Sequence, residues 1–229
     1  MSDTTHDVII IGGSYAGLSA ALQLARARRK VLIIDEGLRR NRFAAQAHGF
    51  LTQDGVDPAA IAATARAQVM AYPSVAWVTG RAQTARKVDG ATSGAAIFEV
   101  TVGDSSHRGR RLILAPGVRD ILPRIEGLQE RWGKSVFHCP YCHGYELDRG
   151  RIGVIAGSEM SLHQALMLPD WGPTTLLLNA ALTPEARQLE ALADRGITVE
   201  PMPVTAIRGH ADVLLADGQA AALGAVDVG

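Results

Sequence analysis

The sequence predicts an α/β fold with two three-layer domains, and three observations lead to it. A short β-branched run, Val8 to Ile11, leads through a glycine-rich turn into an Ala/Leu-rich helix. The same order of strand, turn and helix recurs from Gly153 to Leu162, which can be laid over Ile9 to Leu18. The chain has 229 residues, of which 47% are hydrophobic, and this is enough for one large or two small cores.

The first of these segments has the parts of a Rossmann-type βαβ unit. After the turn at Gly12 to Gly17 we expect a helix over Leu18 to Arg29 and a second buried strand over Val31 to Ile34. That strand ends in Asp35 and Glu36. Strand, turn, helix, strand and acid therefore follow one another in the order that a dinucleotide-binding unit needs.

The special positions of this unit have physical roles. Gly12 allows the tight turn, Gly17 allows close packing of helix on strand, and the helix N-terminus faces the pyrophosphate. Ser14 departs from the pattern, because a glycine normally lets the backbone approach the phosphate there. The acid after the second strand accepts a hydrogen bond from a ribose hydroxyl. We therefore predict that the first domain binds a dinucleotide.

The rest of the first domain is predicted more coarsely. From Gly37 to Gly55 the chain is polar and irregular, and so long a loop is either functional or a solvated surface. The elements expected after this loop are a helix over Pro58 to Tyr72, a β segment from Val75 to Val78 that continues over Ala82 to Val88, and a hairpin of Ala96 to Val102 with Leu112 to Leu114 whose turn is Asp104 to His107.

The second domain repeats the architecture with different residues in the turn. Ala156 replaces the tight-turn glycine, Ser158 stands at the close-approach position and Ser161 replaces the packing glycine. Glu159 adds a negative charge beside any pyrophosphate. The next strand ends in Asn179, which offers neither an acid for a ribose nor a cation for a 2′-phosphate. These changes argue against NADPH as a ligand of this domain.

Both cysteines of the chain lie two residues apart between two histidines. Cys139 and Cys142 form a Cys-x-x-Cys pair, in which one thiolate can attack a disulfide while the other resolves the mixed disulfide. Pro140 stiffens the turn between them. A neighbouring imidazole, from His138 or His143, can pass a proton and lower a thiol pKa. A redox-active dithiol is the favoured interpretation.

Two other roles fit the cysteine pair less well. A zinc site would need two more ligands with metal spacing, and the chain has no second cysteine pair and only scattered further histidines, so no metal site is predicted. A structural disulfide is typical of secreted proteins, and no secretory signal opens this sequence.

Charge and hydropathy exclude several classes of partner. The chain has 23 basic and 23 acidic residues, and a net charge of zero does not favour binding to nucleic acid or to a membrane surface. Its apolar runs are too short to span a bilayer. We therefore expect a cytoplasmic protein.

Four motifs, in this order and spacing, give the chain its resemblance to a known family. Gly12 to Gly17, Asp35, Ala115-Pro116-Gly117 and the stretch Cys139 to Glu146 resemble the low-molecular-weight thioredoxin reductases, which are FAD-dependent pyridine nucleotide-disulfide oxidoreductases. The resemblance covers essentially the whole chain. In detail it is closest to the branch that includes the dithiol oxidases of gliotoxin and holomycin biosynthesis.

This resemblance implies a set of FAD-binding residues in the first domain and its loops. The glycine-rich loop would hold the pyrophosphate, an acid the adenosine ribose, one backbone position the adenine, one loop the flavin, and the end of the domain the junction beside the cofactor. The implied residues are, in chain order, Gly12, Gly13, Ser14, Tyr15, Ala16, Gly17, Asp35, Glu36, Arg42, His48, Ala82, Ala115 and Gly117.

The resemblance also implies the catalytic roles. Cys142 would lie next to the flavin, Cys139 would exchange with the substrate, and His143 would act as the acid/base just after the second cysteine. We predict a dithiol oxidase that passes electrons from a substrate dithiol through the cysteines and FAD to O2. The alternatives are an NADPH-dependent reductase of a thioredoxin-like protein and a binding module without turnover.

The expected organisation follows from the same resemblance. Residues 1–117 would form the FAD-binding domain and residues 118–229 an NAD(P)-binding-like domain that carries the cysteine pair. Because Gly229 falls in what we expect to be the middle of this domain, the chain would lack the C-terminal segment that returns to the FAD domain. The substrate would be a small dithiol or a thioredoxin-like protein, and a homodimer is expected.

Overall fold

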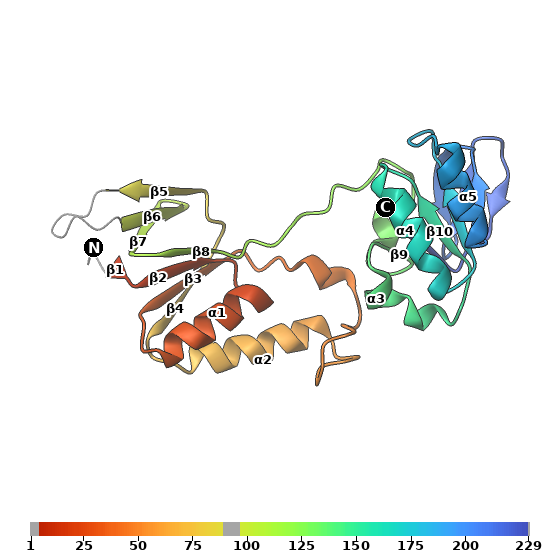
Figure 1. Cartoon of the computed structure of the whole chain (residues 1–229). Coiled ribbons are helices and arrows are strands. Elements are labelled where there is room, and N and C mark those ends of the chain that lie inside the picture. Colours follow the sequence, from red (N-terminus) through yellow and green to blue (C-terminus); the bar gives the residue numbers. More distant parts are fainter. Residues whose placement is uncertain (1–4, 89–96, 229) are drawn as a thin grey trace. The chain divides into compact units, whose positions relative to one another are not determined.

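The computed structural model describes residues 5–88 and 97–228, and the chain divides into two compact units (Figure 1). The first unit contains the residues up to Arg42 together with Asp57–Arg119. The second contains Phe43–Val56 together with Asp120–Gly229. A segment from the long polar loop therefore groups with the later half of the chain.

The centre of the first unit is a four-stranded parallel sheet with the strand order β4-β3-β2-β8. Its strands are almost wholly apolar because both faces are covered: Ile10 and Ile33 pack under helices, and Ile9 and Ile34 pack under a second sheet. The strands are β2 (Val8–Ile11), β3 (Val31–Asp35), β4 (Val75–Thr79) and β8 (Leu112–Leu114).

Helices cover one face of this sheet and a smaller sheet covers the other. The helices are α1 (Tyr15–Arg26) and α2 (Pro58–Met70), which lie together below the strands in Figure 1. The smaller sheet has the order β1-β7-β6-β5. Its strands are β1 (Thr5–His6), β5 (Thr84–Val88), β6 (Ile97–Val102) and β7 (Ser105–Gly109), and a 3-10 turn, η1, spans Arg40–Phe43.

The boundaries of the two helices differ slightly from those predicted. Helix α1 begins at Tyr15, because Ser14 already has the extended conformation of an N-cap, with φ −95° and ψ −163°. It ends at Arg26, and the left-handed φ of 59° at Arg28 excludes the expected continuation to Arg29. Helix α2 begins as predicted at Pro58, where the Asp57 carboxylate accepts the N–H of Ala59 at 2.6 Å.

The predicted hairpin is wrong in its second strand. Strand β6 pairs antiparallel with β7, so most of the residues expected to form the turn are themselves a strand. The turn lies earlier, where Gly103 has a φ of 55°. Leu112–Leu114 is instead β8, parallel to β2. Ala96, the expected first residue of the hairpin, lies outside the described residues.

The β segment expected from Val75 to Val88 is also two separate strands. β4 belongs to the parallel sheet and β5 to the smaller sheet. Between them Gly80 has a φ of 154°, and an added Cβ there would press on Val102. A change of sheet at this glycine could not be derived from the local pattern.

The second unit repeats the three-layer plan around a five-stranded parallel sheet. Its strand order is β12-β11-β10-β16-β9. Two helices cover one face, and a three-stranded antiparallel sheet, β13-β14-β15, covers the other. The parallel strands are β9 (Val136–Phe137), β10 (Ile152–Ile155), β11 (Thr174–Leu177), β12 (Thr198–Glu200) and β16 (Ala225–Val228).

The remaining elements complete these layers. They are the helices α3 (Pro140–His143), α4 (Met160–Met167) and α5 (Ala186–Asp194), the strands β13 (Val204–Arg208), β14 (Asp212–Leu215) and β15 (Ala220–Ala221), and the 3-10 turns η2 (Gln129–Arg131), η3 (Tyr145–Leu147) and η4 (Leu168–Asp170). The α/β fold class predicted from the sequence is confirmed. None of the described helices is long and apolar enough to cross a membrane.

Candidate functional site

At two positions of the turn between β2 and α1 only glycine fits. A Cβ added to Gly12 would overlap the carbonyl oxygen of Ala115, and one added to Gly17 would overlap the carbonyl oxygen of Gly12. Gly12 also has a φ of 102°, which favours glycine. The backbone N–H of Gly13 donates to Oδ1 of Asp35 at 3.1 Å, which ties the turn to the end of β3.

This turn presents the N-terminus of α1 without a cap of its own. The side chain of Ser14 makes no capping hydrogen bond, and the first turn of the helix contains no acidic residue. The first N–H groups of a helix have no partner within it, and its dipole favours an anion there. The described residues therefore fit the pyrophosphate of FAD, the cofactor of the thioredoxin reductase-like enzymes.

The two predicted ribose ligands differ in their surroundings. Asp35 accepts the N–H of Gly13 through Oδ1 and the N–H of Gly37 through Oδ2, at 3.1 Å each. Glu36 is exposed. Because each carboxylate oxygen can accept more than one hydrogen bond, Asp35 can hold the loop and still accept a ribose hydroxyl.

The other predicted cofactor residues of the first unit surround the same strand ends. Tyr15 donates its hydroxyl to the carbonyl of Pro58 at 3.1 Å, and Ala16 is exposed beside it on α1. Ala115 and Gly117 directly follow β8, where the N–H of Ala115 donates to the carbonyl of Ile11 at 2.8 Å. This contact fixes the end of β8 beside the glycine turn.

Two further predicted residues have mainly structural contacts. Ala82 packs on the core under the smaller sheet. Arg42 donates from Nη1 to the carbonyl of Arg39 at 2.7 Å, within the loop that follows β3. Binding of FAD by Ala82 and Arg42 stays a prediction.

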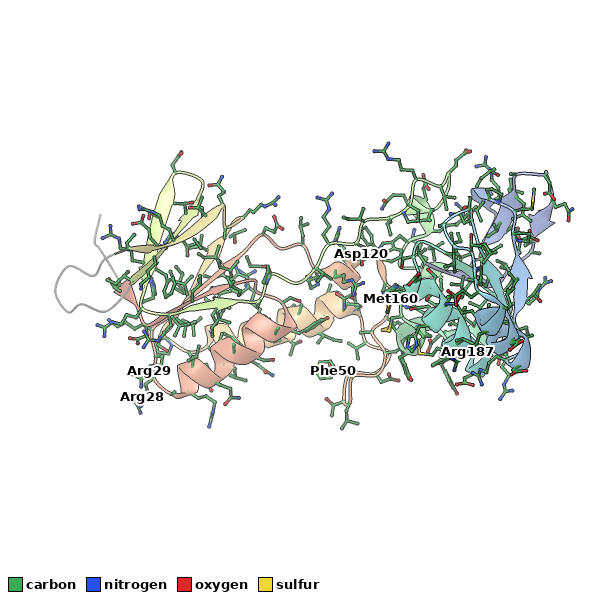
Figure 2. The ribbon with its side chains drawn as sticks, turned by 45° about the horizontal axis from the view of Figure 1, so that its top comes forward. Arg28, Arg29, Phe50, Asp120, Met160 and Arg187 are labelled. Carbon is green, nitrogen blue, oxygen red and sulfur yellow. A yellow bond between two sulfur atoms is a disulfide. The ribbon has the colours of Figure 1, made fainter. Side chains whose placement is uncertain are left out.

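The equivalent turn in the second unit is closed by its own side chains. Oγ of the fully buried Ser161 accepts the N–H of Gly157 at 3.0 Å and faces the N–H of Ser158 at 3.3 Å. Oγ of Ser158 in turn accepts the N–H of Met160, the exposed first residue of α4 labelled in Figure 2, at 3.2 Å. Backbone donors that would face a pyrophosphate thus already have partners.

In the second unit, the residue at the position equivalent to Asp35 also has a partner outside its own turn. Asn179 follows β11 as Asp35 ends β3, but its Oδ1 accepts the N–H of Val204 at 2.9 Å. Asn179 also has a left-handed φ of 50°. The side chain thus stabilises the entry to β13 instead of its own glycine-poor turn.

The cysteine pair lies on a single helical turn and is oxidised. Cys139 and Cys142 form a disulfide, with 5.3 Å between their Cα atoms. Cys139 is the N-cap of α3 and Pro140 its first residue, where the missing N–H of proline costs nothing. Gly144 ends the turn against the Trp171 ring, and a Cβ there would overlap that ring.

His143 packs directly behind the second cysteine. Its ring is stacked on Phe137, with 5.4 Å between ring centroids and 9° between ring planes. Burial lowers the pKa of His143, the Cys139 backbone and the charge of Glu146 oppose this, and the neighbouring His48 adds to it. Neither ring nitrogen has a partner of full hydrogen-bond geometry among the described residues. A lowered pKa makes this imidazole neutral at pH 7, the form that accepts a proton.

His48 belongs to the second unit, in the segment that groups with the cysteine pair. Its Nε2 lies 3.5 Å from Oε1 of Glu146, and its Nδ1 lies 3.5 Å from Oδ1 of Asp54. Asp54 also accepts the N–H of Gly49 at 2.9 Å, which closes the loop around His48. The structure therefore brings His48, Glu146 and His143 together, whereas the sequence linked His48 only with the flavin.

Three residues beside the cysteines were not predicted as site residues. Glu146 lies within the quoted motif, and its acidic side chain three residues after His143 was an available signal. Asp227 is a lone acid in the apolar run of β16, which is the pattern of a buried carboxylate. Gln164 on α4 gave no signal, because its partners come from distant parts of the chain. No cluster able to hold a metal ion is found within residues 5–88 and 97–228.

Comparison with known proteins agrees with this geometry. The family model for pyridine nucleotide-disulphide oxidoreductases matches residues 6–229. Among solved structures, an oxidoreductase from Agrobacterium tumefaciens superimposes with a TM-score of 0.92 at 55% identity, over 98% of this chain and 75% of that one. The crystal structure of HlmI superimposes with a TM-score of 0.92 at 36% identity, over 98% of this chain and 71% of that one.

Two relatives with curated names are thioredoxin reductases from fungi by name. One from Claviceps purpurea is 40% identical over 166 residues, which are 69% of this chain and 50% of that protein. A probable thioredoxin reductase from Arthroderma benhamiae is 37% identical over 151 residues, which are 66% of this chain and 37% of that protein. The chain thus spans half or less of the length of these relatives.

Proposed function

Because the chain belongs to the pyridine nucleotide-disulphide oxidoreductase family, we propose that the protein is an FAD-dependent dithiol oxidase. It converts a substrate dithiol into a disulfide through Cys139 and Cys142, with O2 as the final electron acceptor. The similarity to HlmI and the resemblance to the gliotoxin- and holomycin-type oxidases support this branch of the family.

One observation favours an oxidase over a nicotinamide-dependent reductase. The hydroxyl of Ser161 accepts the N–H of Gly157 and faces the N–H of Ser158, so donors that a pyrophosphate requires are used inside the loop. Glu159 adds a negative charge beside them, and no acid follows β11. A dinucleotide would have to displace these hydrogen bonds, whereas the first unit presents an uncapped helix N-terminus.

In the proposed exchange at the cysteines, each sulfur–sulfur bond that forms replaces one that breaks, and protons are conserved. A substrate thiolate attacks Sγ of Cys139, forming a mixed disulfide and releasing Cys142 as a thiolate. The second substrate thiol, deprotonated, attacks the substrate sulfur of that mixed disulfide, which closes the product disulfide and releases Cys139. Two electrons then reside on the cysteine pair. When bound, FAD supplies an acceptor for them, and O2 is reduced to peroxide.

His143 is suited to the proton transfers in this exchange. Its lowered pKa keeps the ring neutral at neutral pH, so it can take a thiol proton. Stacking on Phe137 fixes the plane of the ring immediately after Cys142. Cys139, the cysteine proposed to meet the substrate, is the partly exposed N-cap of α3.

Several finer points belong to the same proposal. The first unit, through about residue 117, would bind FAD through Gly12 to Gly17 and Asp35, and the unit from residue 118 would carry the redox chemistry. The substrate would be a small dithiol or a thioredoxin-like protein. A cytoplasmic location is proposed from the charge and hydropathy of the sequence and a homodimer from the resemblance, and light scattering of the purified protein would test the dimer.

The second candidate is an NADPH-dependent, thioredoxin-reductase-like enzyme. The names of the curated relatives favour it, at 37–40% identity. In that case electrons would flow from NADPH to the cysteine pair and on to a disulfide. The closed loop at Ser161 argues against this direction.

Anaerobic titration of the flavin-loaded, full-length protein separates the two candidates. NADPH, NADH and dithiothreitol are added in turn while the flavin absorbance is followed, with Cys142→Ser as the matched control. The oxidase is supported if only the dithiol bleaches the flavin, if air restores the colour, and if Cys142→Ser is not bleached. Rapid bleaching by NADPH would overturn the oxidase in favour of the reductase.

A further inference from the structure

Asp227 is a buried acid in the middle of the second sheet that the proposed exchange does not use. It is fully buried on β16, paired in register with Phe137 of β9 and Val154 of β10. Its Oδ2 accepts a hydrogen bond from Gln164, and its Oδ1 has no partner among the described residues. Burying a carboxylate costs free energy, so this position calls for a physical explanation.

Gln164 connects this carboxylate to the peptide that precedes the first cysteine. Its Nε2 donates to Oδ2 of Asp227 at 2.9 Å and to the carbonyl oxygen of His138 at 2.7 Å. Both N–H groups of one amide are thereby used. Since both partners are oxygen acceptors, the nitrogen of the amide must face them.

His138 is fixed to the same strand by a second contact. Its Nδ1 lies 2.9 Å from the carbonyl oxygen of Val228, and because a carbonyl only accepts, Nδ1 must carry the proton. The main chain of His138 is thus held by Gln164 and its ring by β16. The residue before Cys139 is anchored on two sides.

On the other side of Cys139 the short turn is held by the disulfide and by its own backbone, in which the carbonyl of Cys139 accepts the N–H of Cys142 at 3.1 Å. Pro140 has no N–H to donate, and α3 is one turn long. Cys139 itself is extended, with φ −123° and ψ 107°. The position of Sγ of Cys139 therefore depends on the preceding peptide as well as on the turn that follows, and it depends on that peptide most once the disulfide opens.

We propose that Gln164 and Asp227 are positioning residues that hold the His138–Cys139 peptide, and with it Sγ of Cys139, for exchange with the substrate dithiol. The proposal depends on the proposed function only in taking Cys139 as the exchanging cysteine. Whether O2 or a nicotinamide completes the electron path does not enter it.

The charge of Asp227 modulates this contact. Burial raises the pKa of Asp227 to about 6, against the opposing effects of the Gln164 hydrogen bond and of His138. Above that pH the carboxylate accepts a stronger, charge-assisted hydrogen bond from Gln164. The groups that face it are the neutral amide of Gln164 from α4, His138 after β9, and the apolar or glycine residues Ile152–Ile155 of β10.

The test measures how fast dithiothreitol reduces the disulfide of the full-length protein without air. Samples are quenched with iodoacetamide, alkylated cysteines are counted by mass, and rates are corrected for the dithiothreitol thiolate concentration. We expect Gln164→Leu and Asp227→Leu to slow the reduction about tenfold, because each removes a hydrogen bond of the chain that ends at His138. Asp227→Asn retains an oxygen acceptor and should stay within about threefold of wild type at pH 7.5.

The pH profile and a matched control complete the test. The corrected wild-type rate should fall as the pH drops through 6, and Asp227→Asn should reduce that fall to the part that the titration of His143 causes. His163→Ala, which alters an exposed neighbour of Gln164 on α4, should leave the rate unchanged. The proposal is overturned if folded Gln164→Leu reduces at the wild-type rate, or if Asp227→Asn is as slow as Gln164→Leu; these two variants decide it even if Asp227→Leu does not fold. Bleaching of the flavin by NADPH would contradict the proposed dithiol oxidase, but it would not change the outcome of this test of Gln164 and Asp227.

Discussion

The turn after β2 and the turn after β10 start from the same strand–turn–helix pattern and reach opposite states. In the first unit, the atoms around positions 12, 13 and 17 leave no room for a side chain, and the N-terminus of α1 has no side-chain cap. In the second, Ser161 fills the packing position and its hydroxyl accepts a loop N–H. One hydroxyl placed inside such a turn can therefore use the donors that would otherwise bind a phosphate.

The acids after the second strand extend this comparison. Asp35 accepts the N–H of Gly13 and so supports its own turn. Asn179, at the matching place, accepts the N–H of Val204 in the antiparallel sheet of its unit. The first unit therefore has one connected set of groups around the proposed nucleotide site, while the second uses the same positions for internal structure and carries the disulfide instead.

The largest expected effect comes from closing the open turn. In Gly17→Val, the new side chain would overlap the carbonyl of Gly12 and push the turn out of shape. Overpacking of this kind costs about 3 kcal/mol, so FAD binding should weaken about 150-fold. The measurement is flavin absorbance per chain after gel filtration, with exposed Ser19→Ala on the same helix as the control. Full flavin content in Gly17→Val would contradict the assigned pyrophosphate site.

The next largest effect concerns the chemistry found only in the second unit. His143→Asn should slow dithiol oxidation about 100-fold at pH 7.5, because the proton acceptor is lost. In the wild type the neutral ring is the active form, and its lowered pKa should move the acid limb of the pH–rate profile below the usual histidine value of about 6.5. Stopped-flow rates from pH 5 to 8 would show both effects. A variant that keeps the acid limb would assign it to another group.

The third prediction concerns the stability contribution of Asp227, the buried acid of the second sheet. The described strands of the first parallel sheet contain no fully buried acid. The folded-state pKa of Asp227, about 6, lies above its unfolded value, so its contribution to stability is present below about pH 4 and is lost as the pH rises through 6. Relative to Asp227→Asn, the wild type should lose roughly 2 kcal/mol between pH 4 and 7. Urea unfolding at the two pH values tests this, and an unchanged difference would contradict it.

The smallest expected effect is a gain from opening the closed turn. The triple variant Ala156→Gly, Glu159→Gln, Ser161→Ala removes the internal acceptor and one negative charge. NADPH affinity should rise about tenfold, equivalent to about 1.4 kcal/mol, as measured by calorimetry. Ser161→Thr keeps a hydroxyl acceptor and should show no gain. An equal gain in both variants would mean that the hydroxyl is not what closes the turn.

Much of this comparison could be anticipated from local sequence. Strands β2 and β10, the glycine turn and the altered turn at Ala156 to Ser161 each depend on residues within one short window. The cysteine pair is equally local, since its spacing alone places both sulfurs on one helical turn. These features are fixed by backbone sterics and by side chains a few residues apart.

Other features were predicted wrongly or not at all, because they depend on contacts between residues far apart in the sequence. Leu112–Leu114 has the composition of a hairpin strand, yet it pairs in parallel with β2. Likewise, β16 takes the place between β10 and β9 although more than 65 residues separate it from either strand, counting from Ile155 to Ala225. Local propensity cannot rank such alternatives, because the burial gained depends on the completed sheet.

What the sequence by itself determined is the α/β class, the open turn that fits FAD, the cysteine pair that forms the disulfide and the family. Only the tertiary structure decided that Ser161 satisfies the second turn, that His48 lies with Glu146 and His143, and that Gln164 joins Asp227 to the peptide before Cys139. The physical reason is that each of these is a directional contact of a few ångströms. Such contacts exist only once packing has brought separate elements to fixed distances.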